Sequence, residues 1–130
     1  MTENLNPREQ YLGNPNLKKA FTSSEFTEDQ IVELSKCIED PKYFITNFIN
    51  IVTIDRGLVP FEMYEFQERM VDTFHNNRFT ICKLPRQSGK STTTISYLLH
   101  FALFNPNSNI AILANKSSTA RDILGRLQLA

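Results

Sequence analysis

The stretch KLPRQSGKST, residues 83–92, decides how the rest of the chain is interpreted. It ends in Gly-Lys-Ser (residues 89–91) after a short apolar run, which is how a phosphate-binding loop ends. The position where such a loop usually has its first glycine holds Leu84 instead, and Pro85 and Arg86 follow it. The stretch is therefore a damaged nucleotide site, a chance match, or a specialised loop in which Arg86 has a task.

The segments around the loop have the order expected of a nucleotide-binding fold. RFTICKL (78–84) predicts a buried strand before the loop, and STTTISYLLHFALF (91–104) predicts a buried helix after it. NIAILAN (109–115) predicts another buried strand, and a helix is predicted to follow over 117–129. The order strand, loop, helix, strand, helix predicts an α/β fold with a parallel sheet and right-handed crossovers.

The residues upstream of the loop form a different kind of structure. Residues 1–26 are rich in Asn, Pro, Ser and Thr, which predicts an extended or loosely attached arm. Thr27 and Gln30 form the signature of a capping box, and Asp40-Pro41 is typical of the start of a second helix. Two β-rich runs around Asp55-Arg56-Gly57 then predict a hairpin. We accordingly divide the chain into an arm (1–26), a helical and hairpin segment (27–60) and the start of the domain that carries the loop (61–130).

Gln67 is a candidate for contact with a base. A helix is predicted over residues 64–77, and Gln67 follows two aromatic residues on it, Tyr64 and Phe66. A carboxamide can donate to and accept from the edge of an adenine while an aromatic neighbour stacks on the ring. Taken alone, a glutamine at such a place is more often an ordinary solvated residue.

Charge and cysteine content limit the possible function classes. The formal net charge is zero, so the strong positive charge of a dedicated DNA-binding module is absent. The second half of the chain, from residue 61, carries eight Lys/Arg against five Asp/Glu, as an anionic ligand would favour. Cys37 and Cys82 lack metal-ligand spacing and are expected to be buried free thiols in a reducing cytosol. No apolar run is long enough to span a bilayer, so no membrane partner is expected.

Three stretches together resemble a known family. FEMYEFQERM (61–70), RFTICKLPRQSGKSTTTISYLLHFALF (78–104) and AILANKSSTARDIL (111–124) are similar to the ATPase domain of the large terminase subunit of tailed bacteriophages. The similarity is greatest to the T-even-like subgroup and extends over residues 11–130. In that family an aromatic-Gln element precedes the strand, and the loop reads Arg-Gln-x-Gly-Lys-Ser/Thr without a first glycine.

The resemblance implies a role for each residue of the loop. Arg86 is then a catalytic arginine supplied in cis, whereas from the residues alone it is equally well a surface arginine near an anion. Lys90 supplies charge to the β- and γ-phosphates of ATP, and the hydroxyl of Ser91 binds Mg²⁺. The implied nucleotide-binding residues are Gln67, Gln87, Ser88, Gly89, Lys90, Ser91 and Thr92.

The resemblance also implies an architecture and a task. The fold is expected to be the N-terminal part of a P-loop NTPase (RecA/terminase-like) parallel sheet, preceded by a helical lid-like segment. The intact protein is expected to hydrolyse ATP with Mg²⁺ in the host cell cytoplasm and to move duplex DNA into a prohead. It is expected to act as a homo-oligomeric ring on the portal protein, with a small terminase subunit and a separate nuclease domain. A helicase-like or restriction-type translocase and a non-catalytic assembly module stay open as alternatives.

Several parts of such an enzyme are not found in these 130 residues. An apolar strand that ends in an acidic pair does not follow residue 109, and a carboxylate cluster for a nuclease is absent. We therefore expect the chain to be the N-terminal part of a longer protein and to be inactive by itself. The remaining polar candidates, Lys116, Arg121, Arg126, His75 and His100, are interpreted as solvated or structural residues.

Overall fold

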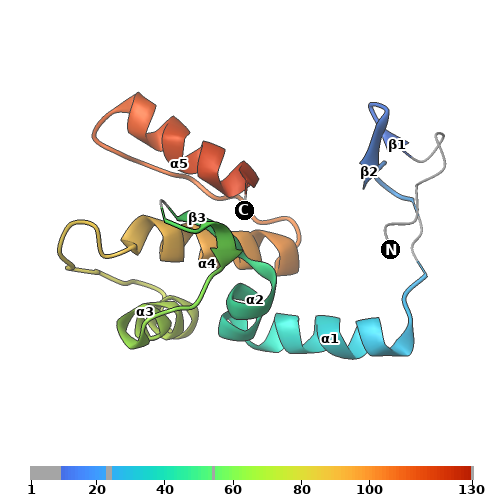
Figure 1. Cartoon of the computed structure of the whole chain (residues 1–130), viewed down its shortest axis with the longest axis horizontal. Helices are drawn as coiled ribbons and strands as arrows, with labels where there is room; N and C mark the ends of the chain where they lie inside the picture. The colour runs from blue at the N-terminus through green and yellow to red at the C-terminus, as the bar shows by residue number, and fades with distance from the viewer. Residues whose placement is uncertain (1–9, 23–24, 54, 130) are drawn as a thin grey trace. The chain divides into compact units, whose positions relative to one another are not determined.

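The computed structural model describes residues 10–22, 25–53 and 55–129, which fall into two units. The first unit extends to Ile31 and the second begins at Val32. The elements, labelled in Figure 1, are β1 (Gln10–Tyr11), β2 (Asn14–Lys18), α1 (Glu28–Glu39), α2 (Pro41–Phe48), β3 (Asn50–Thr53), β4 (Gly57–Pro60), α3 (Glu65–Asn76), α4 (Lys90–Phe104) and α5 (Ser117–Leu129). None of the described helices has the length and apolar character needed to cross a membrane.

The first unit contains a short antiparallel ribbon and the start of α1. β1 and β2 pair with Gln10 opposite Lys18, so part of the predicted arm is paired; its residues 1–9 and 23–24 lie outside the described residues. The predicted capping box is formed at the start of α1. The Thr27 backbone N–H donates to Gln30 Oε1 at 3.0 Å, and the Gln30 N–H donates to Thr27 Oγ1 at 3.3 Å. Two N–H groups at the helix start thereby gain partners.

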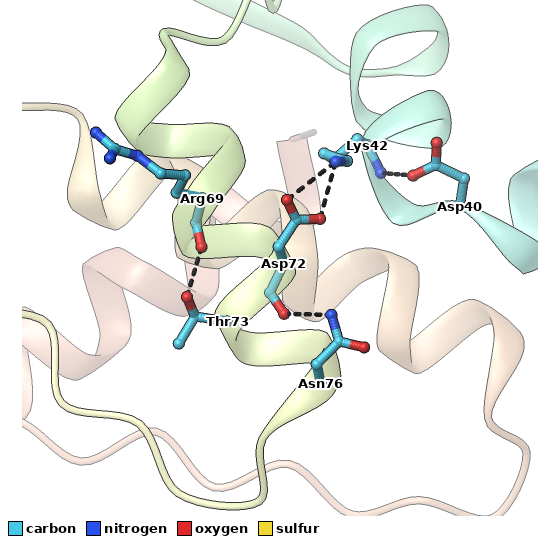
Figure 2. A network of polar contacts seen from close by, with 6 residues as sticks. All are labelled: Asp40, Lys42, Arg69, Asp72, Thr73 and Asn76. Carbon is cyan, nitrogen blue, oxygen red and sulfur yellow. Dashed lines mark hydrogen bonds and ion pairs between the residues drawn. The ribbon is translucent and has the colours of Figure 1, made fainter.

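α2 begins as predicted at the Asp40-Pro41 pair. Asp40 is the N-cap, and its side chain accepts a hydrogen bond of 2.8 Å from the backbone N–H of Lys42. The side chain of Lys42 reaches the carboxylate of Asp72 on α3, with Nζ–O distances of 2.9 and 3.0 Å (Figure 2). This ion pair, together with contacts between the two helices, ties α2 to α3.

The core of the second unit is built around α2 and α4. The predicted hairpin is formed by β3 and β4, which pair with Ile51 opposite Val59. α4 contacts α2, α3 and α5 and lies between them (Figure 1). The buried hydrophobic cluster consists of Cys37, Phe44, Ile45, Ile49, Phe61 and Val71. The predicted burial of α4 holds for four of its residues, Thr93, Ile95, Ser96 and His100.

The two strands predicted on either side of α4 are not formed. Residues 78–84 and 109–115 have no strand pairing, and both sheets in the described part of the chain are antiparallel ribbons. The apolar side chains that were expected to be buried there are exposed: Phe79 at 84%, Ile81 at 98% and Leu113 at 94%. A strand is stabilised by hydrogen bonds to a neighbour and by packing on its faces, and neither segment has such a neighbour. The α/β class is therefore observed, whereas the parallel sheet is not.

Because residues 78–84 do not form a strand, one prediction about the cysteines is wrong. Cys37 is buried as expected, but Cys82 is exposed. Cys82 lies in the segment that was predicted to be a buried strand, and without strand pairing its side chain remains at the surface.

Candidate phosphate site

The loop of residues 85–89 leads directly into α4. Gly89 is the N-cap of the helix and has φ +74°, in the left-handed region. A residue with a Cβ pays about 1–2 kcal/mol to adopt this conformation, so glycine is favoured at the point where the chain turns into the helix. Gln87 also has a positive φ, of 61°, and the loop therefore contains two left-handed residues separated by Ser88.

Two hydrogen bonds close the loop on itself at Pro85. The carbonyl oxygen of Pro85 accepts from Ser88 Oγ at 3.0 Å and from Lys90 Nζ. The ammonium group of Lys90, on the first residue of α4, thus lies against the loop that precedes the helix. A lysine ammonium group and the N-terminus of a helix thus lie side by side at this loop, an arrangement that favours anions.

Gln67 holds the loop from α3. Its side chain is only 3% exposed, and both ends of the carboxamide are hydrogen bonded within the chain. Oε1 accepts from the backbone N–H of Tyr64 at 2.9 Å, which caps the start of α3, and Nε2 donates to the carbonyl of Ser88 at 3.2 Å. Gln67 is thus a buried link between α3 and the loop that precedes α4.

The other predicted site residues lie around this loop in different ways. Arg86, Gln87 and Ser91 are exposed, whereas Ser88 and Thr92 are half-buried. The side chain of Thr92 lines a hollow of about 350 Å³ together with residues of β3, β4 and α5, among them Ile51 and Arg126. Gln67 thus contacts Ser88 and Gly89, and Ser88 and Lys90 share the carbonyl oxygen of Pro85 as acceptor. Arg86 and Ser91 are exposed beside them.

The residues present fit a phosphate group better than they fit a complete metal site. The first N–H groups of α4 have no acceptor in the helix, and with Lys90 they give the loop mouth a positive character. For Mg²⁺ the loop offers the hydroxyl of Ser91, an oxygen ligand of the kind that this ion takes. Among the described residues there is no group of three or more His, Cys, Asp or Glu side chains that could hold a metal ion.

A comparison with known families identifies the part of the chain that contains this loop. Residues 81–127 match the family described as the terminase large subunit, T4likevirus-type, N-terminal. This segment is similar to the N-terminal part of large terminase subunits. The resemblance inferred from the loop sequence is confirmed, and the family supports a role in DNA packaging.

The terminase match covers the loop and α4 and ends within α5. Gln67, the helices α1 to α3 and the hairpin precede the matched residues. The role predicted for Gln67 in binding adenine therefore stays a prediction. Tyr64, which is exposed, stacks on Phe66 with ring centroids 5.8 Å apart, so the aromatic pair beside Gln67 is present.

The hydrogen bonds of Gln67 with Tyr64 and Ser88 were not predicted from the sequence. The contact with Tyr64 has a local signal. Gln67 is the third residue of α3, and a glutamine at that position commonly accepts a hydrogen bond from the backbone N–H of the N-cap residue, here Tyr64. Tyr64 is not a usual N-cap residue, which hides the signature. The donation to Ser88 joins residues 21 positions apart and has no local signal.

The remaining polar residues behave as structural or surface groups. His100 is 3% exposed and its Nε2 lies 2.7 Å from the carbonyl oxygen of Cys37. Because a carbonyl only accepts, Nε2 carries the proton and donates. Burial lowers the pKa of His100 below its ordinary value of 6.5, although the hydrogen bond to Cys37 acts in the opposite direction. Lys116, Arg121 and Arg126 are exposed, as expected for a solvated face.

Proposed function

We propose that this chain provides the ATP-binding loop of a DNA-packaging motor of the terminase type. The observation that carries the proposal is the arrangement of Gly89 and Lys90. The left-handed N-cap turns the chain into a helix of 15 residues, and the next residue brings an ammonium group back onto the loop. A helix N-terminus with an adjacent lysine favours a polyphosphate.

Lys90 and Arg86 have distinct tasks in this proposal. Lys90 exchanges the carbonyl of Pro85 for the β- and γ-phosphates of ATP, because a charged acceptor makes a stronger hydrogen bond than a neutral carbonyl. Arg86 is exposed four residues before Lys90, and its guanidinium neutralises charge that develops on the γ-phosphoryl group. Arg86 thus acts during turnover, whereas Lys90 acts in binding.

Ser91 is the proposed contact of this chain with Mg²⁺. Its hydroxyl is exposed at the start of α4, beside Lys90. The bound ion supplies charge neutralisation at the phosphate oxygens. Gln87, Ser88, Gly89 and Thr92 contribute backbone N–H groups to the phosphates, as the positive end of α4 favours.

The parallel sheet of a P-loop NTPase (RecA/terminase-like) is part of the proposal. Residues 78–84 and 109–115 flank α4, as the two strands of a crossover unit do. The near-complete exposure of Ile81 and Leu113 supports pairing in the working motor, because burial of such side chains is favourable by about 1.5–3 kcal/mol each. The helical segment 27–60 would then precede this sheet as a lid-like element.

The partners follow from the terminase family alone. We propose that the motor is a homo-oligomeric ring on the portal protein in the host cytoplasm and acts with a small terminase subunit. It hydrolyses ATP to move duplex DNA into the prohead, and a separate nuclease domain cuts the DNA. The family that residues 81–127 match is the support for this assignment.

The ligand of the loop can be tested by nuclear magnetic resonance. Titration of the ¹⁵N-labelled chain with ATP and Mg²⁺ is expected to shift the backbone amides of residues 86–92 most, since these surround the proposed phosphates. The amides of β1 and β2, in the other unit, serve as an internal control. Saturable shifts confined to residues outside the loop would contradict the proposal.

A further inference from the structure

We propose that the β1–β2 ribbon of one copy of this chain binds the exposed apolar face of α1 in a second copy. The ribbon comprises residues 10–22, which contain both strands and the turn after them. The inference rests on the proposed function in one respect, the homo-oligomeric ring, for which it names a contact between copies. It does not depend on the nucleotide site.

The ribbon presents an aromatic side chain on a strained backbone. Phe21 is fully exposed and has φ +65°. It lies in the turn in which the N–H of Thr22 donates to the carbonyl oxygen of Lys19 at 3.3 Å, and a left-handed residue at this place in a turn is usually glycine. A bulky residue is strained in this conformation, and a ring that faces water gains no burial in return. Phe21 is therefore suited to be an anchor in the surface of another protein.

The turn between the two strands also exposes apolar side chains. Tyr11 and Leu12 are exposed there, and Leu12 has φ +50°. The ribbon has two short antiparallel strands, and such a ribbon is only marginally stable unless it packs against a further surface. A partner that covers these side chains therefore stabilises the ribbon itself.

α1 has an apolar face that suits the ribbon. Ile31, Leu34 and Ile38 have the three- and four-residue spacing that places side chains on one side of a helix, and all three are exposed. The other side of α1 is attached to α2, because Glu33 accepts a hydrogen bond from the hydroxyl of Tyr43. The apolar face thus remains exposed while α1 is held by its opposite side.

The charges of the two surfaces are opposite. The ribbon carries Lys18 and Lys19 and no Asp or Glu, a formal charge of +2. α1 carries four acidic residues against one lysine, a formal charge of −3, and Glu28 lies three residues before Ile31 on the apolar side. Opposite charges favour the pairing of a ribbon with α1, whereas like charges disfavour the pairing of two ribbons or of two α1 helices. Because every copy carries both surfaces, a second copy is the partner that the charges favour.

Mixing two variants tests the contact. Phe21→Ala removes the anchor of the ribbon and Leu34→Glu places a charge on the apolar face of α1, so each variant keeps one intact surface. All chains, the parent included, carry Ile81→Lys, because residues 78–84 are another exposed apolar segment. In sedimentation velocity, each variant alone should self-associate at least about tenfold more weakly than the parent, the scale of one buried aromatic side chain. The equimolar mixture should regain association, and a fluorescent label on one variant should show that unlike chains pair.

Leu124→Glu is the matched control, since it makes the same change at an exposed leucine of α5. This variant should associate as the parent does, and added sodium chloride should weaken the association of the parent because opposite charges contribute to it. A loss of association in Phe21→Ala and Leu34→Glu that mixing does not restore would overturn the inference, and so would a parent that stays monomeric. Titration of Phe21→Ala with ATP keeps the two proposals apart. Unchanged ATP binding beside failed association would leave the proposed nucleotide site standing.

Discussion

Gln67 and Gly89 pack so closely that a Cβ on Gly89 would lie within 3.0 Å of Gln67 Nε2. Gly89 also has φ +74°, so two separate costs oppose any side chain at this position. The left-handed backbone costs about 1–2 kcal/mol. The steric overlap adds a further cost, because the end of the Gln67 side chain must shift and lose its hydrogen bond to Ser88, worth about 0.5–1.5 kcal/mol.

The first prediction uses these two costs. Gly89→Ala should lower the free energy of unfolding by about 1.5–3.5 kcal/mol, from backbone strain and the lost hydrogen bond of Gln67 together. In Gln67→Ala/Gly89→Ala the overlap is removed and only the strain remains, so the two substitutions should not be additive. Urea unfolding of the four proteins measures the coupling. Strict additivity would mean that Gln67 and Gly89 do not interact.

The second prediction concerns acid stability. Because burial lowers the pKa of His100 in the folded chain, the unfolded chain binds the proton more readily. The contribution of the neutral imidazole is fully present above the unfolded value of about 6.5 and is lost as the pH falls through the lower folded pKa. His100→Gln, which retains a donor for the Cys37 carbonyl, should lose less stability between pH 7 and pH 5 than the unmodified chain does. If the unfolding free energies of His100→Gln and of the unmodified chain changed equally with pH, His100 would have no part in the loss of stability in acid.

Several features of the fold could be predicted because their causes are local. The capping box of Thr27 and Gln30 and the helix start at Asp40 each depend on residues a few positions apart. The hairpin of β3 and β4 has the same property. In each case the sequence contains both partners of the stabilising contact.

The features that could not be predicted depend on distant partners. Segments 78–84 and 109–115 have the composition of strands, yet composition cannot supply the neighbouring strand that pairing requires. The hydrogen bond between His100 and Cys37 joins residues 63 positions apart, and the bond from Gln67 to Ser88 joins residues 21 apart. At the candidate site, the loop and its lysine were predicted, but the buried link from α3 was not.

The third prediction follows from the exposed segment before the loop. Ile81 is 98% exposed, so Ile81→Lys should leave the thermal midpoint of the free chain within about 2 °C, as for other surface substitutions. Because the substitution removes an apolar group from an unpaired segment, it should reduce self-association. Scanning calorimetry and sedimentation velocity measure the two effects. A clear fall in the midpoint would show that Ile81 is packed in solution.

The fourth prediction separates Arg86 from Lys90. Arg86 is exposed and its proposed task is confined to the transition state, so Arg86→Ala should leave the affinity of the chain for ATP within about threefold. In the complete packaging motor the same change should lower turnover by about 10³-fold or more, the scale of a catalytic arginine. Equal and modest losses in affinity and turnover would reduce Arg86 to a ground-state phosphate contact.

The central claim is that the loop before α4 binds the phosphates of ATP through Lys90, and titration calorimetry of Lys90→Ala tests it most directly. Lys116→Ala, which removes an exposed lysine just before α5, is the matched control. With Mg²⁺ present, we predict that Lys90→Ala weakens ATP binding by about 10²-fold, consistent with loss of a charged hydrogen bond of 1.5–3 kcal/mol. The Lys116→Ala chain should bind as the unmodified chain does. Equal ATP affinity of a correctly folded Lys90→Ala chain and the unmodified chain would contradict the account.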